Sequence, residues 1–379
     1  MNRRRVLGSL ATVGVSSLAG CSQGSSEETT TPESNGEVAS NAFESFRGSG
    51  PLTQDRSVEG GTRIKQLPSL RGELTIYLGG GEGGLYRDLI SRLEEIYPEF
   101  SPRLREAGTA DLANTIISEG SATPADVFWS VDAGSLAAVT DADMTTELSS
   151  QVIGDVPDEF HPDDQWIGTA GRARAIPYNN ARLSAEEIPN SVMDFPDAPA
   201  LDSAVGWAPT YGAFQAFITA MRLIEGESAT RTWLEEMVAA GVSSYKNEFF
   251  VSNAVADGGL TAGFANHYYA LRVQASRPEA PISVTFTQDG PGALINVAGA
   301  AVLQGSQRQE RAQNFIRHLL SAEAQEFFAT RTFSYPMVSA VPPVGGLPSI
   351  DELNPPSVNL SELSNLQPTI ELLRDVDIL

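Results

Sequence analysis

Hydrophobic residues in the first half of the folded region alternate between strand-like runs and helix-like spacing. Residues 74–78 form a short run that favours a strand, and apolar residues then recur every three or four positions over 85–96. A second helical stretch covers about 111–118, and residues 125–129 have the apolar content of a buried strand. This alternation predicts an α/β fold with short connections.

The same two patterns continue toward the C-terminus. Residues 172–178 are predicted to be extended, as a crossing between two lobes, and residues 292–303 form another apolar extended run. Ser321 has the position of a helix N-cap, with Glu323 in the first turn of the helix that follows. Helical spacing also recurs in three longer stretches, residues 211–225, 228–239 and 312–319.

Residues 1–21 have the pattern of an export signal. Arg3, Arg4 and Arg5 precede an apolar run over 6–19, which is shorter than the roughly 20 residues that cross a bilayer. Such a run is typical of a cleaved signal peptide, and the leading arginines indicate twin-arginine export. Cys21 is the only cysteine and ends the sequence LAGC, so we expect it to be lipidated rather than to pack as a small buried residue.

The protein is therefore expected on the extracellular face of the membrane, held there only by its lipid. The residues after Cys21 are polar and include few large apolar side chains. We expect a flexible tether over 22–71, although the composition of residues 49–71 is also compatible with partial order.

The charge balance is strongly acidic. The 379 residues include 48 acidic and 25 basic side chains, a net charge of −23, and Lys65 and Lys246 are the only lysines. Such a surface repels nucleic acid and anionic lipid headgroups, so neither is expected as a partner. Acid excess with so few lysines is what we expect of a protein bathed in concentrated salt, where self-repulsion is screened, and this indicates a halophilic source.

A glycine-rich segment follows the first strand. Gly79, Gly81 and Gly84 satisfy a G-x-G-x-x-G pattern between a strand and a helix. An exported protein has no ready supply of dinucleotide, and Glu106, the acid expected about 20 residues on, lies in no clear second strand. We favour a ligand-facing loop that points Glu82 into a cleft, with a tight turn that binds nothing as the alternative.

Two adjacent tyrosines, Tyr268 and Tyr269, are the next candidate site. Neighbours on a helix diverge by roughly 100°, so their hydroxyls meet only at a helix end or in irregular backbone. Glycines at 258, 259 and 263 predict a transition from strand to helix just before them. Phenolate is a hard oxygen ligand and ferric ion a hard acid that displaces its proton, although a free phenol has a pKa near 10. Aromatic packing in a hinge or core is the equal alternative.

Histidine is scarce, with His161, His267 and His318 the only three. His318 faces away from the apolar stripe of its predicted helix, so we expect it on the surface. Neither a pair spaced for one helix face nor a cysteine partner exists, so no zinc site is expected. A G-x-S-x-G nucleophile motif is also absent from the sequence, and we do not expect an enzyme.

Several motifs from Leu74 onward resemble the ferric-iron-binding lipoproteins of ABC importers, in the type II periplasmic-binding-protein class. They are residues 123–128 (TPADVF), 171–174 (GRAR), 207–214 (WAPTYGAF), 266–269 (NHYY) and 291–294 (PGAL). The resemblance implies two α/β lobes joined by hinge strands, which close on the ligand. It places 72–173 with 290–335 in lobe 1, and 174–289 with 336–379 in lobe 2.

The resemblance also implies roles for individual residues. Tyr268 and Tyr269 match the paired tyrosinate ligands of iron. A synergistic anion, carbonate or phosphate, would lie at a helix N-terminus, a place that suits anions on physical grounds. The residues matched to this anion site are Tyr211, Gly212, Ala213, Asn266 and Arg172, with Arg174 in the same arginine-containing segment.

The first-lobe ligands of the family are missing. Their positions fall near Gly81 and Val131, and the extra tyrosine of another branch would fall near Pro177. Glu82 and Asp132 lie one residue away, and we expect them to substitute as metal ligands. In addition, Glu248 stands where a family asparagine helps to hold phosphate, and a carboxylate there would disfavour a phosphate neighbour.

The sequence thus predicts a monomeric, non-enzymatic, surface-anchored solute-binding protein. It would capture ferric ion or a small ferric complex in the cleft between the lobes and deliver it to an ABC permease. One alternative is a binder of a small oxyanion or phosphonate that uses Tyr211–Ala213 and Arg172. Another, from a different class, is a secreted hydrolase on the same scaffold, with Glu82 or Asp132 beside His267.

Overall fold

The computed structural model describes residues 43–379, except 55, 81–83, 289, 354 and 357. The predicted signal, Cys21, the first part of the tether and Glu82 lie outside the described residues. In the part that is described, none of the helices has the length and apolar content needed to cross a membrane.

Two hydrophobic clusters organise the fold. The first core includes Leu74, Phe128 and Phe315, and the second core includes Trp207 and Phe217. The strands around the first core are β1 (Gly72–Gly79), β2 (Phe100–Ala107), β3 (Val127–Ser130) and β4 (Thr145–Thr146). Its helices are α2 (Leu85–Ile96), α3 (Thr109–Glu119), α4 (Ala133–Asp141), α5 (Ser150–Ile153), α10 (Gln309–Leu319) and α11 (Ala322–Phe327), followed by a π-helix (Phe328–Thr332).

Short strands and longer helices lie around the second core and around a smaller apolar cluster that includes Val251 and Ala270. The strands are β6 (Val205–Trp207), β7 (Ser243–Ser244), β8 (Ala262–Gly263), β9 (Ala265–Asn266) and β10 (Ser283–Thr285). The helices are α6 (Gly212–Ile224), α7 (Glu227–Ala239), α8 (Glu248–Ala256) and α9 (His267–Ser276). The helices predicted over 85–96, 211–225 and 228–239 are confirmed to within a residue or two, because their apolar faces follow the helical period.

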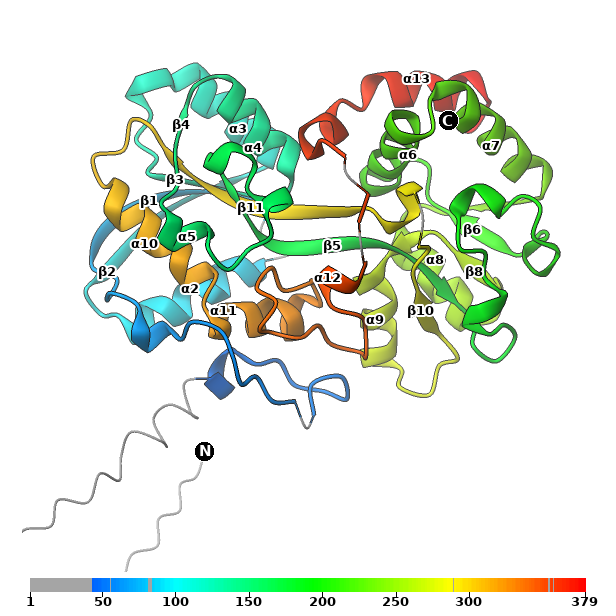
Figure 1. The fold of residues 1–379 in the computed structure, drawn as a ribbon, viewed down its shortest axis with the longest axis horizontal. Coiled ribbons are helices and arrows are strands. Elements are labelled where there is room, and N and C mark those ends of the chain that lie inside the picture. Colours follow the sequence, from blue (N-terminus) through cyan, green and yellow to red (C-terminus); the bar gives the residue numbers. More distant parts are fainter. Residues whose placement is uncertain (1–42, 55, 81–83, 289, 354, 357) are drawn as a thin grey trace, which may run out of the picture. The chain divides into compact units, whose positions relative to one another are not determined.

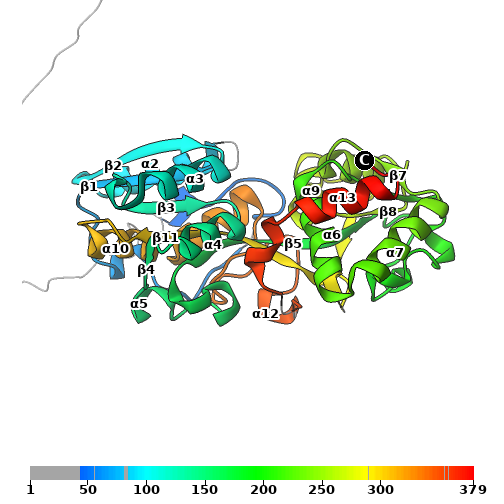
Figure 2. The ribbon, with the colours of Figure 1, turned by 90° about the horizontal axis from the view of Figure 1, so that it is seen from above.

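Two long antiparallel strands connect the cores, β5 (Ile167–Tyr178) and β11 (Ile295–Leu303). Across the described strands the order is β2-β1-β3-β11-β5-β8-β6-β7. β5 contributes Ala173 to the first core and Ile176 to the second, and Figures 1 and 2 show it running from one group of elements to the other. The predicted α/β fold and the extended crossing segment are confirmed.

The C-terminal segment packs on both cores. Met337 and Ile350, the latter in α12 (Ile350–Leu353), belong to the first core. Leu372 and Leu373 of α13 (Gln367–Asp375) belong to the second. The sequence placed this whole tail with the second lobe, whereas in the structure its apolar residues as far as Leu363 pack in the first core and only those of α13 pack in the second.

The described residues before β1 are ordered on the protein, which corrects the tether expected there. Phe46 is fully buried in the first core. Arg47 and Arg56 both form ion pairs with the buried carboxylate of Glu326, at 2.7 and 3.0 Å. A polar composition concealed this contact, because the partner lies some 270 residues further along the chain.

His318 is buried, contrary to the surface position expected for it. Its side chain is 0 % exposed, and its Nδ1 donates to the carbonyl oxygen of Asn314 at 2.7 Å. Nε2 lies 3.1 Å from the hydroxyl of Tyr97. Burial, together with the nearby positive charge of Arg317, lowers the pKa of His318 to about 4. Other elements therefore cover more faces of α10 than the apolar stripe of this helix predicts.

This buried histidine should make the protein acid-sensitive. The unfolded chain binds a proton below a pKa of about 6.5, whereas folded His318 does so only below about 4, so stability is lost as the pH falls through this window. The shift corresponds to about 3 kcal/mol of unfolding free energy. Urea unfolding at pH 7 and pH 4.5 should show a smaller loss in His318→Gln than in the wild type. Equal losses in the two proteins would contradict the assignment.

Candidate functional site

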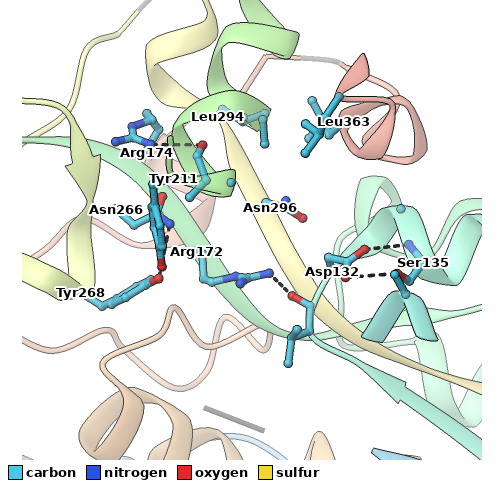
Figure 3. A pocket seen from close by; sticks show the side chains of 17 residues that line it. Asp132, Ser135, Arg172, Arg174, Tyr211, Asn266, Tyr268, Leu294, Asn296 and Leu363 are labelled. Carbon is cyan, nitrogen blue, oxygen red and sulfur yellow. Dashed lines mark hydrogen bonds between the residues drawn. The ribbon is translucent and has the colours of Figure 1, made fainter. Parts of the chain in front are cut away.

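A cavity of about 450 Å³ lies between the two cores. Side chains from the β3–α4 turn, β5, the start of α6, the β9–α9 junction and the C-terminal segment line it. Figure 3 shows Tyr211, Asn266 and Tyr268 on one side of the cavity, Asp132 and Ser135 on the other, and Arg172 between them. The predicted residues that line this cavity are Asp132, Arg172, Arg174, Tyr211, Gly212, Ala213, Asn266 and Tyr268.

The two adjacent tyrosines lie in the first turn of α9, as the glycine pattern predicted. Asn266 is the N-cap residue, with extended backbone, and the helix begins at His267. The rings of Tyr268 and Tyr269 are 4.3 Å apart between centroids. Asn266 Nδ2 donates to the hydroxyl of Tyr268 at 3.5 Å, and the hydroxyl of Tyr269 is hydrogen-bonded to that of Tyr211. Three phenol groups therefore gather at this helix end.

The surroundings keep Tyr269 neutral in the metal-free protein. Burial raises the pKa of Tyr269 far above its ordinary value, and the neighbouring Tyr268 and Tyr211 raise this pKa further. The guanidinium of Arg272 lies 4.8 Å from the ring centroid of Tyr268 and 5.6 Å from that of Tyr269, where a positive charge favours an anionic ligand set. A bound cation would have to displace the phenol protons.

The start of α6 is suited to an anion. Tyr211 is the N-cap residue and its side chain makes no capping hydrogen bond, so Gly212 and Ala213 present first-turn N–H groups beside the cavity. Arg172 donates to the carbonyl oxygen of Val131. Among the described residues, Nε and Nη2 of Arg174 are buried without a hydrogen-bond partner. The guanidinium of Arg172 and the helix N-terminus favour an anion in this region, whereas the charge of Arg174 is paired with the buried carboxylate of Glu248.

Glu248 holds two of the cavity residues in place. Its Oε1 accepts from Arg174 Nη1 at 2.7 Å, and its Oε2 accepts from the backbone N–H of Asn266 at 2.8 Å. The side chains of Glu248 and Arg174 are 0 % and 2 % exposed, so this is a buried ion pair. Sequence reasoning noted Glu248 only as a departure from the family pattern and missed this role. A lone carboxylate at the start of an apolar helix was the available signal.

The two carboxylates predicted as metal ligands, those of Asp132 and Glu82, are less suited to bind a metal ion without further ligands. Asp132 is the N-cap of α4, and its carboxylate accepts from the N–H of Ser135 at 2.7 Å and from its hydroxyl at 3.2 Å. Glu82, the other candidate, lies outside the described residues. Within the ranges that the structure describes, no three His, Cys, Asp or Glu side chains form a metal-binding group.

The side chain of His267 is hydrogen-bonded to the backbone of two other segments. Its Nε2 donates to the carbonyl oxygen of Phe333 at 2.7 Å, and its Nδ1 accepts from the N–H of Ala173 at 3.2 Å. Complete burial lowers the pKa of His267 to about 4, so the ring is neutral at ordinary pH. Both nitrogens are used, so His267 offers no free base to the hydrolase alternative.

Comparison with known proteins identifies similar chains. The profile of the family described as bacterial extracellular solute-binding proteins matches residues 122–355. The Fe(3+)-binding periplasmic protein of Serratia marcescens is 30% identical, over 73% of this chain and 82% of its own length. The major ferric iron-binding protein of Neisseria meningitidis serogroup A is also 30% identical, over 72% of this chain and 83% of its own.

Solved structures of iron-binding proteins are also similar to this chain. Iron-bound HitA from Pseudomonas aeruginosa has a TM-score of 0.67 and 28% identity, and the match covers 80% of this chain and 99% of HitA. Trichodesmium FutA, in complex with iron and citrate ligands, has a TM-score of 0.64 and 26% identity, with coverage of 80% and 99%. The expected two-lobe, periplasmic-binding-protein-like architecture is confirmed.

Proposed function

This chain belongs to the family of bacterial extracellular solute-binding proteins, and on that premise we propose that it captures ferric ion in the cavity between its cores and delivers it to an ABC permease. Proteins of this family bind solutes and are not enzymes, which agrees with the expectation from the sequence and excludes the hydrolase alternative. Similarity to proteins named for ferric iron supports the choice of solute.

The observation that carries the proposal is the pair of tyrosines in the first turn of α9. Tyr268 lines the cavity, and the hydroxyl of Tyr269 meets that of Tyr211, another lining residue. Deprotonated phenols are hard oxygen ligands of the kind that ferric ion prefers. Asp132, across the cavity, and Glu82 are proposed to add carboxylate ligands from the first lobe.

A synergistic anion is proposed at the start of α6. The N–H groups of Gly212 and Ala213 would hold carbonate or phosphate, with Arg172 and Asn266 beside it. The buried, unpartnered nitrogens of Arg174 favour the same site, because an anion would satisfy them. This observation also supports the second candidate function, a binder of a small oxyanion or phosphonate.

The setting of this activity follows from the N-terminal sequence. We propose twin-arginine export, lipid attachment at Cys21, and action as a monomer on the extracellular face of the membrane in concentrated salt. Replacing Cys21 by serine should move the protein from the membrane fraction to the medium. Retention of the Cys21→Ser protein in the membrane fraction would contradict the lipid anchor.

The experiment that tests the function is a titration of the purified protein with ferric citrate in molar salt. Tyrosinate coordination should give a visible ligand-to-metal absorption band that saturates at one equivalent of iron. Absence of this band would reject a tyrosinate iron site. Thermal stabilisation by a phosphonate or phosphate, without any response to iron, would favour the oxyanion binder.

A further inference from the structure

One segment of the first core is attached to the helix that carries the two adjacent tyrosines. The π-helix (Phe328–Thr332) ends at Phe333, whose φ of 59° is one that residues other than glycine rarely adopt. The carbonyl oxygen of Phe333 accepts from Nε2 of His267 at 2.7 Å, and His267 is the first residue of α9. A π-helical turn and an unusual backbone conformation are both features that cluster at functional sites.

The side chain of His267 is held on a second side as well. Its Nδ1 accepts from the backbone N–H of Ala173 in β5 at 3.2 Å, and the centroid of its ring lies 4.7 Å from that of Tyr335. Tyr335 in turn exchanges two backbone hydrogen bonds with Gly171 of β5, each of 2.8 Å. His267, which is 1 % exposed, therefore joins α9 both to β5 and to the segment that follows the π-helix.

The π-helix is itself held in place by the N-terminal segment. Arg331 Nε donates to the carbonyl oxygen of Phe46 at 2.9 Å, and the backbone N–H of Gly48 donates to Oγ1 of Thr330 at 2.8 Å. A side chain at Gly48 would overlap the carbonyl oxygen of Thr330, so the two segments are in close contact. The hydrogen bond from His267 therefore ends on a part of the first core that is fixed by other contacts.

The ring of Phe333 lies beside the tyrosines. It packs against the apolar cluster of Ala265, Tyr268 and Tyr269, and against a neighbouring cluster that includes Leu271 of α9. The backbone of Phe333 thus holds the first residue of α9 while its side chain packs next to the phenol rings. A shift of this residue would move the first turn of the helix and the phenols with it.

We propose that His267 is a positioning residue for the iron site. Its hydrogen bond to Phe333 fixes the first turn of α9 to the first core and so sets where the phenol oxygens of Tyr268 and Tyr269 lie. This inference rests on the proposed function and adds no ligand to the metal. Groups that orient metal ligands typically change the affinity for the metal by about 10–100-fold, so the loss of this hydrogen bond should be measurable.

The test uses variants that separate the two nitrogen atoms of His267. Glutamine can place an amide nitrogen near the position of Nε2 and still donate to Phe333, asparagine can replace only Nδ1, and phenylalanine replaces neither. His267→Gln should keep the iron affinity and the visible band of the wild type. His267→Asn and His267→Phe should release iron to citrate at a chelator concentration about 10–100-fold lower, with the band at a shifted wavelength because the phenolates lie differently.

His318→Phe is the matched control. His318 is also a buried histidine with both ring nitrogens in use, but it lies on α10 and is not among the residues that line the cavity. Its replacement should destabilise the protein without changing the iron band or the affinity. Hydrogen exchange of the metal-free proteins gives a readout that needs no iron, because the amides of α9 should exchange faster in His267→Phe than in the wild type and in His318→Phe.

Two results would overturn the positioning role and leave the iron site standing. One is a wild-type band and affinity in His267→Phe, or in His267→Asn if the phenylalanine variant does not fold. The other is an equal loss in His267→Gln and His267→Phe, since the hydrogen bond to Phe333 would then not be the cause. Absence of the iron band in the wild type itself would overturn the proposed function, and this inference with it.

Discussion

Replacing Tyr268 and Tyr269 together by phenylalanine is expected to abolish the visible iron band and most of the affinity for ferric ion. Loss of a group that merely supports a metal ligand costs about 10–100-fold in affinity, so loss of two direct ligands should exceed this. Within the described structure, no cluster of His, Cys, Asp or Glu is available to replace them.

The measurement is a competition between the protein and citrate for iron, monitored through the intensity of the visible band. Tyr178→Phe is a suitable control, because this tyrosine is buried in the second core at the end of β5, away from the cavity lining. Each single variant, Tyr268→Phe or Tyr269→Phe, should weaken the band without abolishing it. Undiminished binding by the double variant would show that the iron ligands lie elsewhere.

Replacing Glu248 by alanine is expected to cost about 3–5 kcal/mol of unfolding free energy, the usual effect of removing one partner of a buried ion pair. Arg174 would keep its charge in a site where it is only 2 % exposed, and the N–H of Asn266 would lose its acceptor. Because Arg174 and Asn266 both line the cavity, ligand binding should weaken as well.

A double-mutant cycle separates charge from packing. Glu248→Gln should be strongly destabilising by itself, and Arg174→Met in the same chain should recover much of the loss, because the uncompensated charge is gone. The exposed pair of Arg231 and Asp375 is the control, where Asp375→Asn should change the unfolding free energy by less than about 1 kcal/mol. Additive effects at Arg174 and Glu248 would contradict a coupled buried pair.

Local patterns in the sequence predicted the longer helices and placed the two adjacent tyrosines at the start of a helix. The helical spacing over 85–96 and 228–239 reproduces α2 and α7, because a helix that covers a core must repeat its apolar residues at its own period. Ser321 caps α11 by accepting from the N–H of Ala324, as expected. The start of α9 beside Tyr268 was predictable because glycines just upstream interrupt regular structure.

Only the tertiary structure decided which distant side chains meet. Tyr211 reaches Tyr269 across 58 residues of sequence, and Arg174 reaches Glu248 across 74. His318 is buried because elements outside its own helix, including Tyr97, cover its polar side. The spacing of apolar residues shows which face of a single helix or strand is buried. The neighbours of a polar side chain depend instead on how separate elements pack together. The sequence alone therefore determined the longer helices, several of the strands, the family resemblance and the place of the two tyrosines at a helix start. Tertiary packing decided which side chains surround those tyrosines.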